Sequence, residues 1–292
     1  MAQQEDPQVL VSTAWLEAHL HDSDLRVLDA SWYLPEDVRD ARAEYAAAHI
    51  PGARFFSIDD ISDTASPLPH MVPPAEQFTT RLRALGVGDS HQVVVYDCMG
   101  LFSAARVWWL FRLMGKTRIA VLDGGLRKWR AEGRALEDVS PIIGYRHMTA
   151  QRQNHLVRDA AQVADAAQNG SCCIIDARAE ARFAGKVEEP RPHLRKGHIP
   201  GSFNLPYTRL LNPDHTLKPP AALRTAFESA GVDLSKPAIA TCGSGITAAI
   251  LCLAMERFGK SDYALYDGSW AEWGANPTLP IATGDPTKCS PN

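Results

Sequence analysis

The 292-residue sequence predicts an α/β protein made of two similar halves, each a parallel sheet flanked by helices. Two observations carry this prediction. Short apolar runs alternate with longer stretches of helical periodicity, which is typical of parallel strands joined by crossover helices. Several sequence landmarks also recur in one order at a spacing of 144 to 149 residues, which indicates an internal duplication.

Four pairs of segments carry the duplication. In both halves an aspartate ends a predicted strand, a His-Ile-Pro-Gly segment follows, a cysteine ends an apolar run, and an Asp-Gly pair lies 25 positions after that cysteine. Landmarks in one order at nearly one spacing indicate two copies of the same fold. The pairs are VLDASW (27–32) with IIDARA (174–179), HIPG at 49–52 and 198–201, Cys98 with Cys242, and LDGGLRKW (122–129) with YDGSWAEW (266–273).

The expected elements follow from hydrophobic periodicity. Short apolar runs predict buried strands, and longer runs with apolar residues three or four apart predict helices. In the first half we expect strands at 26–30, 93–97 and 118–124, and helices around 43–49, 75–86 and 103–115. In the second half we expect strands at 172–176 and 236–241 and a helix at 246–258.

The segment between the halves, EGRALEDVSPIIGYRHMTAQRQN, has no clear periodicity. We therefore expect two domains, residues 8–135 and 158–285, joined by a linker over 136–157. The chain is long enough for two domains of ordinary size.

Composition excludes several classes of protein. A formal net charge of −4 and a pI near 6.2 argue against a general nucleic-acid or acidic-membrane binder. No run approaches 18 consecutive apolar residues, so we expect no transmembrane helix. The N-terminal MAQQEDPQVLV is acidic where a signal or transit peptide is basic, which favours a cytoplasmic location.

Six cysteines are present, none in a Cys-x-x-Cys pair and none in a His/Cys cluster with zinc spacing. We therefore expect no metal site and, in a reducing cytosol, free thiols. Cys252 in an apolar helix and Cys172 and Cys173 at a strand fit the ordinary role of cysteine as a small buried hydrophobe. Cys289, in the C-terminal tail, is expected to be exposed and has no evident partner.

Cys242 differs from the other cysteines because it lies on a strand-to-helix turn, ATCGSGITAA. Ligands of open parallel sheets sit beyond the carboxyl ends of the strands, and the first amides of a helix lack intrahelical partners. Gly243 and Gly245 allow the backbone to curl so that these amides converge on one point. A thiolate at that point would be stabilised as a nucleophile. The alternative is a buried structural cysteine beside glycines that merely turn the chain.

The paired HIPG segments, the Asp-Gly-x-x-x-x-Trp segments and the single loop cysteine of the second half resemble the tandem-domain rhodanese family, from about residue 8 to residue 280. The loop CGSGIT is similar to the usual Cys-Gly-Ser-Gly-Val-Thr of the branch that uses 3-mercaptopyruvate. The thiosulfate branch has Cys-Arg-Lys-Gly-Val-Thr, with cations where this chain has Gly243 and Ser244.

The resemblance implies a two-step sulfur transfer without a metal or organic cofactor. The Cys242 thiolate attacks the sulfur of mercaptopyruvate, releases pyruvate and retains the sulfur as a persulfide. The persulfide then passes its sulfur to cyanide, a small thiol or a reduced thioredoxin-like protein. The residues expected to bind the donor are Arg182, Arg191, Gly243, Gly245, Ile246 and Thr247.

Arg182 and Arg191 match the two family arginines that hold the carboxylate and ketone of the donor. A carboxylate favours the planar bidentate fork of arginine over lysine. Counted from the shared landmarks, the first half has Pro35 in place of Arg182 but Arg42 in place of Arg191, so only Arg182 is specific to the second half. The sequence VEEPR departs from the family's Glu-Pro-x-Pro-Arg, and the alternative is two solvated surface arginines.

The resemblance also suggests a Ser-His-Asp relay made of Ser244, His70 and Asp59. Such a relay would protonate the departing enolate, since histidine exchanges protons near neutral pH when a carboxylate orients it. His70 and Asp59 come from the first half, so we expect the site between the two domains. The alternative for His70 is a loop residue that caps backbone groups, and Asp60 or Asp63 could replace Asp59.

Residues that both halves share are expected to be structural, because the first half lacks the Cys-Gly-Ser-Gly loop. We therefore exclude six residues from catalysis. They are His49, His198, Asp29, Asp176, Asp123 and Asp267.

Aligning CMGLFSAA with CGSGITAA by their alanine pairs puts Cys98 in register with Cys242. A functional interpretation would make Cys98 a second persulfide site or a redox switch. However, Met99 replaces Gly243, and bulky apolar residues follow it. Burial without amide donors raises the pKa of a thiol. We therefore predict that Cys98 is unreactive.

Two other functions stay open from the sequence. One is the same chemistry with thiosulfate as the preferred donor. The other is a persulfide carrier or sensor that is loaded by a partner and turns over little. Arg182 and Arg191 favour a small keto-acid donor, because a carrier loaded by a protein needs no carboxylate clamp.

Overall fold

The computed structural model describes residues 5–284, so Cys289 and the expected domain end at residue 285 lie outside the described residues. The chain divides into two compact units, here called the N-terminal and C-terminal units. Each unit borrows a short segment from the other half of the sequence. The N-terminal unit takes in the chain up to Ala65, Val72–Gln153 and Asn212–Leu217, and the C-terminal unit takes in Ser66–Met71, Asn154–Leu211 and the chain from Lys218 onward.

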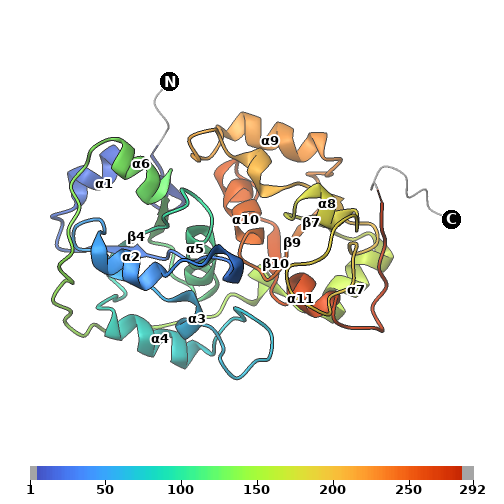
Figure 1. The fold of residues 1–292 in the computed structure, drawn as a ribbon, viewed down its shortest axis with the longest axis horizontal. Coiled ribbons are helices and arrows are strands. Elements are labelled where there is room, and N and C mark those ends of the chain that lie inside the picture. The colour runs from blue at the N-terminus through green and yellow to red at the C-terminus, as the bar shows by residue number, and fades with distance from the viewer. Residues whose placement is uncertain (1–4, 285–292) are drawn as a thin grey trace. The chain divides into compact units, whose positions relative to one another are not determined.

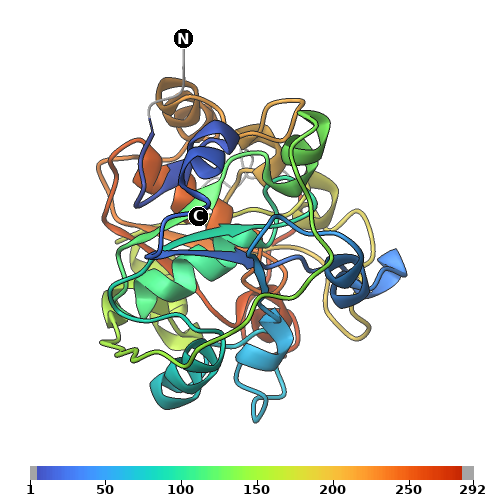
Figure 2. The same cartoon turned by 90° about the vertical axis from the view of Figure 1, so that its left-hand side faces the viewer.

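The N-terminal unit contains a five-stranded parallel sheet in the order β1-β5-β4-β2-β3. Figures 1 and 2 show this unit from two directions, mostly in blue to green. The central strand β4 is buried along its whole length, as its run of valines predicts for a sheet covered on both faces. The strands are β1 Leu10–Val11, β2 Leu25–Asp29, β3 Arg54–Phe55, β4 Gln92–Tyr96 and β5 Ile119–Leu122.

Helices cover both faces of this sheet. Side chains from α1, α2 and α6 share one apolar core with the strands, and the almost entirely buried α5 packs against β4 and β5. The helices are α1 Thr13–His19, α2 Ala41–Ala47, α3 Ile58–Ile61, α4 Ala75–Ala84, α5 Ala104–Leu113 and α6 Gly125–Ala131, with a 3₁₀ turn at Pro35–Asp37.

The C-terminal unit repeats this architecture with the strand order β6-β10-β9-β7-β8, again all parallel. The predicted α/β class with two sheets flanked by helices is therefore confirmed. The strands are β6 Val157–Arg158, β7 Cys173–Asp176, β8 Phe203–Asn204, β9 Ala238–Thr241 and β10 Tyr263–Tyr266. The helices are α7 Ala160–Asn169, α8 Glu180–Phe183, α9 Pro220–Ser229, α10 Ala248–Arg257 and α11 Ser269–Trp273, with 3₁₀ turns at Asn154–Leu156 and Tyr207–Leu210.

The strand register shows which residues of the two units correspond. Asp29 pairs with Tyr96, and its counterpart Asp176 pairs with Thr241. Asp97, which follows Tyr96, therefore takes the place of Cys242. The hydrogen bonds agree, because the carbonyl oxygen of Asp97 accepts from the Leu126 amide at 2.9 Å and that of Cys242 accepts from the Trp270 amide at 3.0 Å.

The alignment of Cys98 with Cys242 was therefore wrong by one position. Between the strand and the helix the N-terminal unit has seven residues, 97–103, whereas the C-terminal unit has six, 242–247. Alignment by the alanine pairs at the helix start placed this extra residue before the loop, but the pairing of the strands places it inside the loop.

Along residues 5–284, no helix combines the length and the apolar character needed to cross a membrane.

Candidate active site

Cys242 lies directly after β9, at the carboxyl end of the sheet of the C-terminal unit, and is only 2% exposed. Its carbonyl oxygen accepts from the Trp270 amide, and that of Gly243 accepts from the Ala271 amide at 2.9 Å. The amide of Cys242 donates to Ser269 Oγ at 3.3 Å. The start of α11 thus holds the first two residues of the loop in place.

The loop between Cys242 and the start of α10 presents a series of backbone N–H groups. Gly245 has a φ of 80°, a conformation that glycine adopts without steric cost, so the chain can curl at this point. Among the described residues, none supplies a hydrogen-bond acceptor to the amide groups of residues 243–248. These donors, together with the N-terminal end of α10, favour an anion.

The corresponding loop of the N-terminal unit shows what these donors can hold. The carboxylate of Asp97, the counterpart of Cys242, is fully buried and accepts five backbone N–H groups of its own loop. The N-terminal loop therefore surrounds a carboxyl group that the chain itself supplies; burial raises the pKa of Asp97, and the backbone N–H donors oppose that rise. The donors are Met99 and Gly100 at 2.9 and 3.0 Å from Oδ1, and Phe102, Ser103 and Ala104 at 2.7, 2.9 and 2.9 Å from Oδ2.

Arg182, on α8, and Arg191 both lie beside Gly243 of the Cys242 loop. A Cβ atom added to Gly243 would lie 3.2 Å from Nη2 of Arg182 and 3.9 Å from Nη1 of Arg191. Glycine at this position therefore leaves space for two guanidinium groups beside the Cys242 turn. Two such groups together can bind a planar anion with several oxygens.

The structure shows a buried ionic network in contact with Arg182 that the sequence did not predict. Glu189, whose side chain is 1% exposed, accepts from Arg178 Nη1 at 2.9 Å and from Arg182 Nη2 at 2.5 Å. Arg178 in turn pairs with Asp176 at 2.6 Å and stacks over the ring of Trp270 at 4.2 Å. The one sequence signal for this network was Glu189, the second acidic residue of VEEPR, which falls at the position that the family pattern leaves unspecified.

Arg178 also contributes to the electrostatics of the loop. Burial opposes its charge, but the carboxylates of Asp176 and Glu189 and the sulfur of Cys242 raise the pKa of Arg178. Arg178 therefore remains a fixed cation in this network.

Two of the three predicted relay residues lie together. Nδ1 of His70 is 3.1 Å from Oγ of Ser244, and the two residues are only 7% and 6% exposed. Residues 66–71, which carry His70, come from the first half of the sequence but fold as part of the C-terminal unit. His70 has a φ of 59°, an uncommon backbone conformation for a non-glycine residue.

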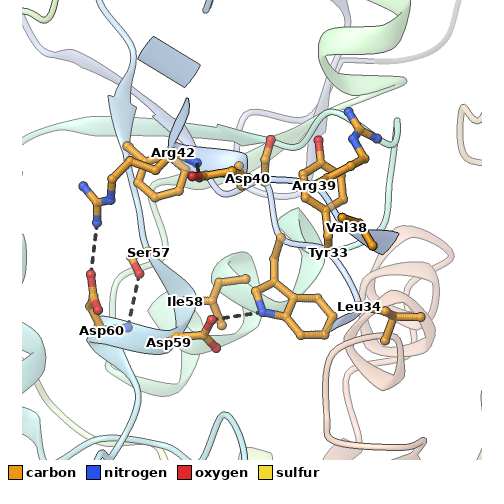
Figure 3. Close-up of a pocket in the computed structure, with 14 residues that line it drawn as sticks. Tyr33, Leu34, Val38, Arg39, Asp40, Arg42, Ser57, Ile58, Asp59 and Asp60 are labelled. Atoms are coloured by element: carbon orange, nitrogen blue, oxygen red, sulfur yellow. Dashed lines mark hydrogen bonds and ion pairs between the residues drawn. The ribbon is translucent and has the colours of Figure 1, made fainter. Parts of the chain in front are cut away.

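Asp59, the third predicted member, lies on α3 of the N-terminal unit and lines a cavity of about 680 Å³ (Figure 3). Its Oδ2 accepts from Nε1 of Trp32 at 3.2 Å. Arg42, the counterpart of Arg191, lines the same cavity and pairs with Asp60 at 3.1 Å.

The sulfur of Cys98 lies 2.6 Å from the hydroxyl of Tyr33, which also bonds to Glu44. Burial raises the pKa of the Cys98 thiol. The loop amides of this unit go to Asp97 instead, and an unreactive Cys98 stays a prediction. Cys173 and Cys252 are buried as expected, and Cys172 is half-buried.

His49 and His198, which recur in both halves, have equivalent structural contacts. Nδ1 of His49 bonds to the carbonyl of Tyr45 at 2.7 Å, and Nδ1 of His198 bonds to that of Phe183 at 2.8 Å. Each imidazole also stacks on the ring of its partner. Within residues 5–284, no group of three or more His, Cys, Asp and Glu side chains is placed to hold a metal ion.

Both halves of the chain match one known family of domains. The rhodanese-like domain model matches residues 12–132 and 159–276. Thiosulfate/3-mercaptopyruvate sulfurtransferase 1 of Arabidopsis thaliana is 43% identical over 297 residues, with 93% of this chain and 77% of the relative covered. Human 3-mercaptopyruvate sulfurtransferase is 42% identical over 279 residues, with 94% of each chain covered.

The fold comparison agrees. The crystal structure of SseA from Escherichia coli, described with the catalytic mechanism of 3-mercaptopyruvate sulfotransferases, superposes with a TM-score of 0.83 at 38% identity. The match covers 89% of this chain and 98% of that protein.

Proposed function

Because this chain belongs to the rhodanese family and is a sulfurtransferase, we propose that Cys242 is its nucleophile and 3-mercaptopyruvate its preferred sulfur donor. The observation that carries the proposal is the convergence of Arg182 and Arg191 on Gly243, the residue after that cysteine. A donor bound by these guanidinium groups through its carboxylate and ketone would have its sulfur beside Cys242.

In the first step the Cys242 thiolate attacks the sulfur of mercaptopyruvate. An S–S bond forms, the C–S bond breaks, and the electron pair of that bond goes to carbon to give the enolate of pyruvate. Protonation of that carbon releases pyruvate and leaves Cys242 as a persulfide. In the second step the outer sulfur passes to a nucleophilic acceptor, and the thiolate of Cys242 is restored.

The amides of residues 243–248 stabilise the negative charge on the outer persulfide sulfur. Support comes from Asp97, whose carboxylate oxygens extend beyond Cβ to much the same reach as a persulfide and accept five amides of the equivalent loop. Ile246 and Thr247 contribute to this set of donors through their backbones. Preorganised amides of this kind stabilise charge that develops during a reaction.

Arg182 binds the donor through one edge of its guanidinium group only. Its Nε and Nη2 face Glu189 at 3.4 and 2.5 Å, which leaves the edge formed by Nη1 and Nη2 for the donor. Arg191 contributes the second fork. The absence of a cation at positions 243 and 244 favours a keto-acid donor over dianionic thiosulfate.

Ser244 and His70 deliver the proton to the enolate, and Asp59 completes the relay. Support comes from the 3.1 Å contact between the imidazole and the serine hydroxyl of the reactive loop. A serine held by an imidazole can transfer a proton without a net change of its own charge.

In the second step the sulfur is accepted by a nucleophile that reacts through carbon or sulfur, such as cyanide, a small thiol or a reduced thioredoxin-like protein. A cytoplasmic location, in which such thiols are kept reduced, is part of the same proposal.

The proposal is tested by measuring kcat/KM for mercaptopyruvate and for thiosulfate side by side, with cyanide as acceptor. We expect the higher value for mercaptopyruvate. A wild-type protein that prefers thiosulfate would instead support the alternative donor.

A further inference from the structure

Glu189 is a carboxylate in direct contact with Arg182, and its surroundings fix it there. Its two oxygens face Arg178 and Arg182 at once, and its side chain is almost entirely buried. Arg178 is itself held by Asp176, by the carbonyl of Gly197 at 2.8 Å and by the ring of Trp270. Glu189 therefore cannot move away from Arg182 without leaving a buried charge unpaired.

The charges of this network cancel. Asp176 and Glu189 each contribute one negative charge, and Arg178 and Arg182 each contribute one positive charge. Arg182 thus presents a directional hydrogen-bonding edge to the loop, while much of its positive charge is compensated by the carboxylate behind it.

We infer that Glu189 is a specificity-determining residue that sets the charge of the donor site to suit an anion of one negative charge. This inference rests on the proposed function and concerns the choice of donor. A negative charge behind Arg182 repels every bound anion, and the repulsion grows with the charge of that anion. Glu189 therefore disfavours a dianion such as thiosulfate more strongly than a monoanion such as mercaptopyruvate.

The same residue aligns the arginine. By taking Nε and Nη2, Glu189 turns the remaining edge of Arg182 toward Gly243. The negative charge of Glu189 and its alignment of Arg182 predict different effects when Glu189 is substituted. Glu189→Gln removes the charge and keeps the size of the side chain, whereas Glu189→Asp keeps the charge and shortens the side chain.

The neighbouring Glu188 offers a matched control. Its side chain is 80% exposed and pairs with Lys196, away from the buried network. Glu188→Gln therefore removes the same formal charge, one residue along the chain, in a position screened by solvent.

The test measures kcat/KM for thiosulfate and for mercaptopyruvate, with cyanide as acceptor, in the wild type and in the Glu189→Gln, Glu189→Asp and Glu188→Gln variants. We expect Glu189→Gln to raise the ratio of thiosulfate to mercaptopyruvate roughly 10-fold at low salt, and less at high salt. The ratio should stay within about twofold of wild type in Glu189→Asp and Glu188→Gln. If Glu189→Gln does not fold, Glu189→Met removes the same charge at similar volume.

An unchanged or lower ratio in the folded neutral variants would overturn the inference, as would an equal shift in Glu188→Gln or Glu189→Asp. The ratio of the wild type itself tests the proposed donor. The change of that ratio on substitution tests Glu189, so the two claims fail separately.

Discussion

Asp97 in the N-terminal unit occupies the position that Cys242 holds in the C-terminal unit, at the end of the central strand and before the loop to the helix. Its carboxylate accepts five amides of its own loop. One half of the duplicated fold therefore has a carboxyl group of its own among the loop amides, where the other half has a cysteine. If Cys242 is the nucleophile, Asp97 explains why the N-terminal loop has no equivalent group.

Replacing Asp97 should destabilise the protein and leave its activity nearly unchanged. Asp97→Asn replaces one of the two acceptor oxygens that five amides share with an NH2 group, so we expect a loss of about 1–3 kcal/mol in the free energy of unfolding, measured with urea. Asp63→Asn, which alters a loop carboxylate that accepts only the Ala65 amide at 3.0 Å, should cost less. Equal stability of the Asp97 and Asp63 variants would show that the amides contribute little through this contact.

Cys98 should react more slowly than Cys242. Burial raises the pKa of Cys98, so little thiolate is present at neutral pH, and its fraction grows only as the pH rises above the usual thiol range of about 8.5. Iodoacetamide at neutral pH, followed by peptide mass spectrometry, should label Cys242 first, and Cys98→Ala should keep near-wild-type turnover. Comparable labelling rates, or a persulfide on Cys98, would give the protein two sulfur sites.

Removing either donor arginine should weaken turnover of mercaptopyruvate. We expect Arg182→Ala and Arg191→Ala each to lower kcat/KM by roughly 10- to 100-fold, because a charge-assisted hydrogen bond is lost. Arg182→Lys should recover only part of this loss, since lysine lacks the bidentate fork. Arg209→Ala, on an exposed 3₁₀ turn, is the control and should behave as wild type. Normal kcat/KM in both alanine variants would exclude an arginine clamp.

The Ser244–His70 contact should affect kcat more than KM. We expect Ser244→Ala and His70→Asn each to lower kcat by about 100-fold, as is typical for loss of general acid catalysis. Asparagine is chosen because it tolerates the positive φ of position 70 better than most residues. If the two side chains act as one unit, the double variant should be little slower than either single variant. Fully additive losses would argue for separate roles.

Much of the fold could be predicted because hydrophobic periodicity and the internal repeat are local features of the sequence. The strands at β4 and β9 and the helices α5 and α10 lie within two residues of the expected bounds. The alignment of the Asp97 loop with the Cys242 loop could not be predicted in the same way. An insertion of one residue within a turn leaves both flanking patterns intact, so only the hydrogen-bonded pairing of the strands reveals where it lies.

Arg182 and Arg191 could be named from the sequence, but the carboxylate that Arg182 contacts could not. Glu189 lies seven residues after Arg182 and 11 after Arg178, and no sequence pattern in this polar segment pairs them. The segment with His70 likewise joins the C-terminal unit although it belongs to the first half of the sequence. Ionic contacts within an irregular segment and exchanged segments both depend on tertiary packing, which local patterns do not encode.

The central claim is that the sulfur travels on Cys242. The most direct measurement is intact and peptide mass spectrometry after incubation with mercaptopyruvate in the absence of an acceptor. We expect an added mass of about 32 Da, one sulfur atom, on the peptide with Cys242, lost again on addition of cyanide. Cys242→Ser should fold normally and show neither the adduct nor turnover. Substantial activity in that variant, or an adduct on another cysteine, would contradict the account.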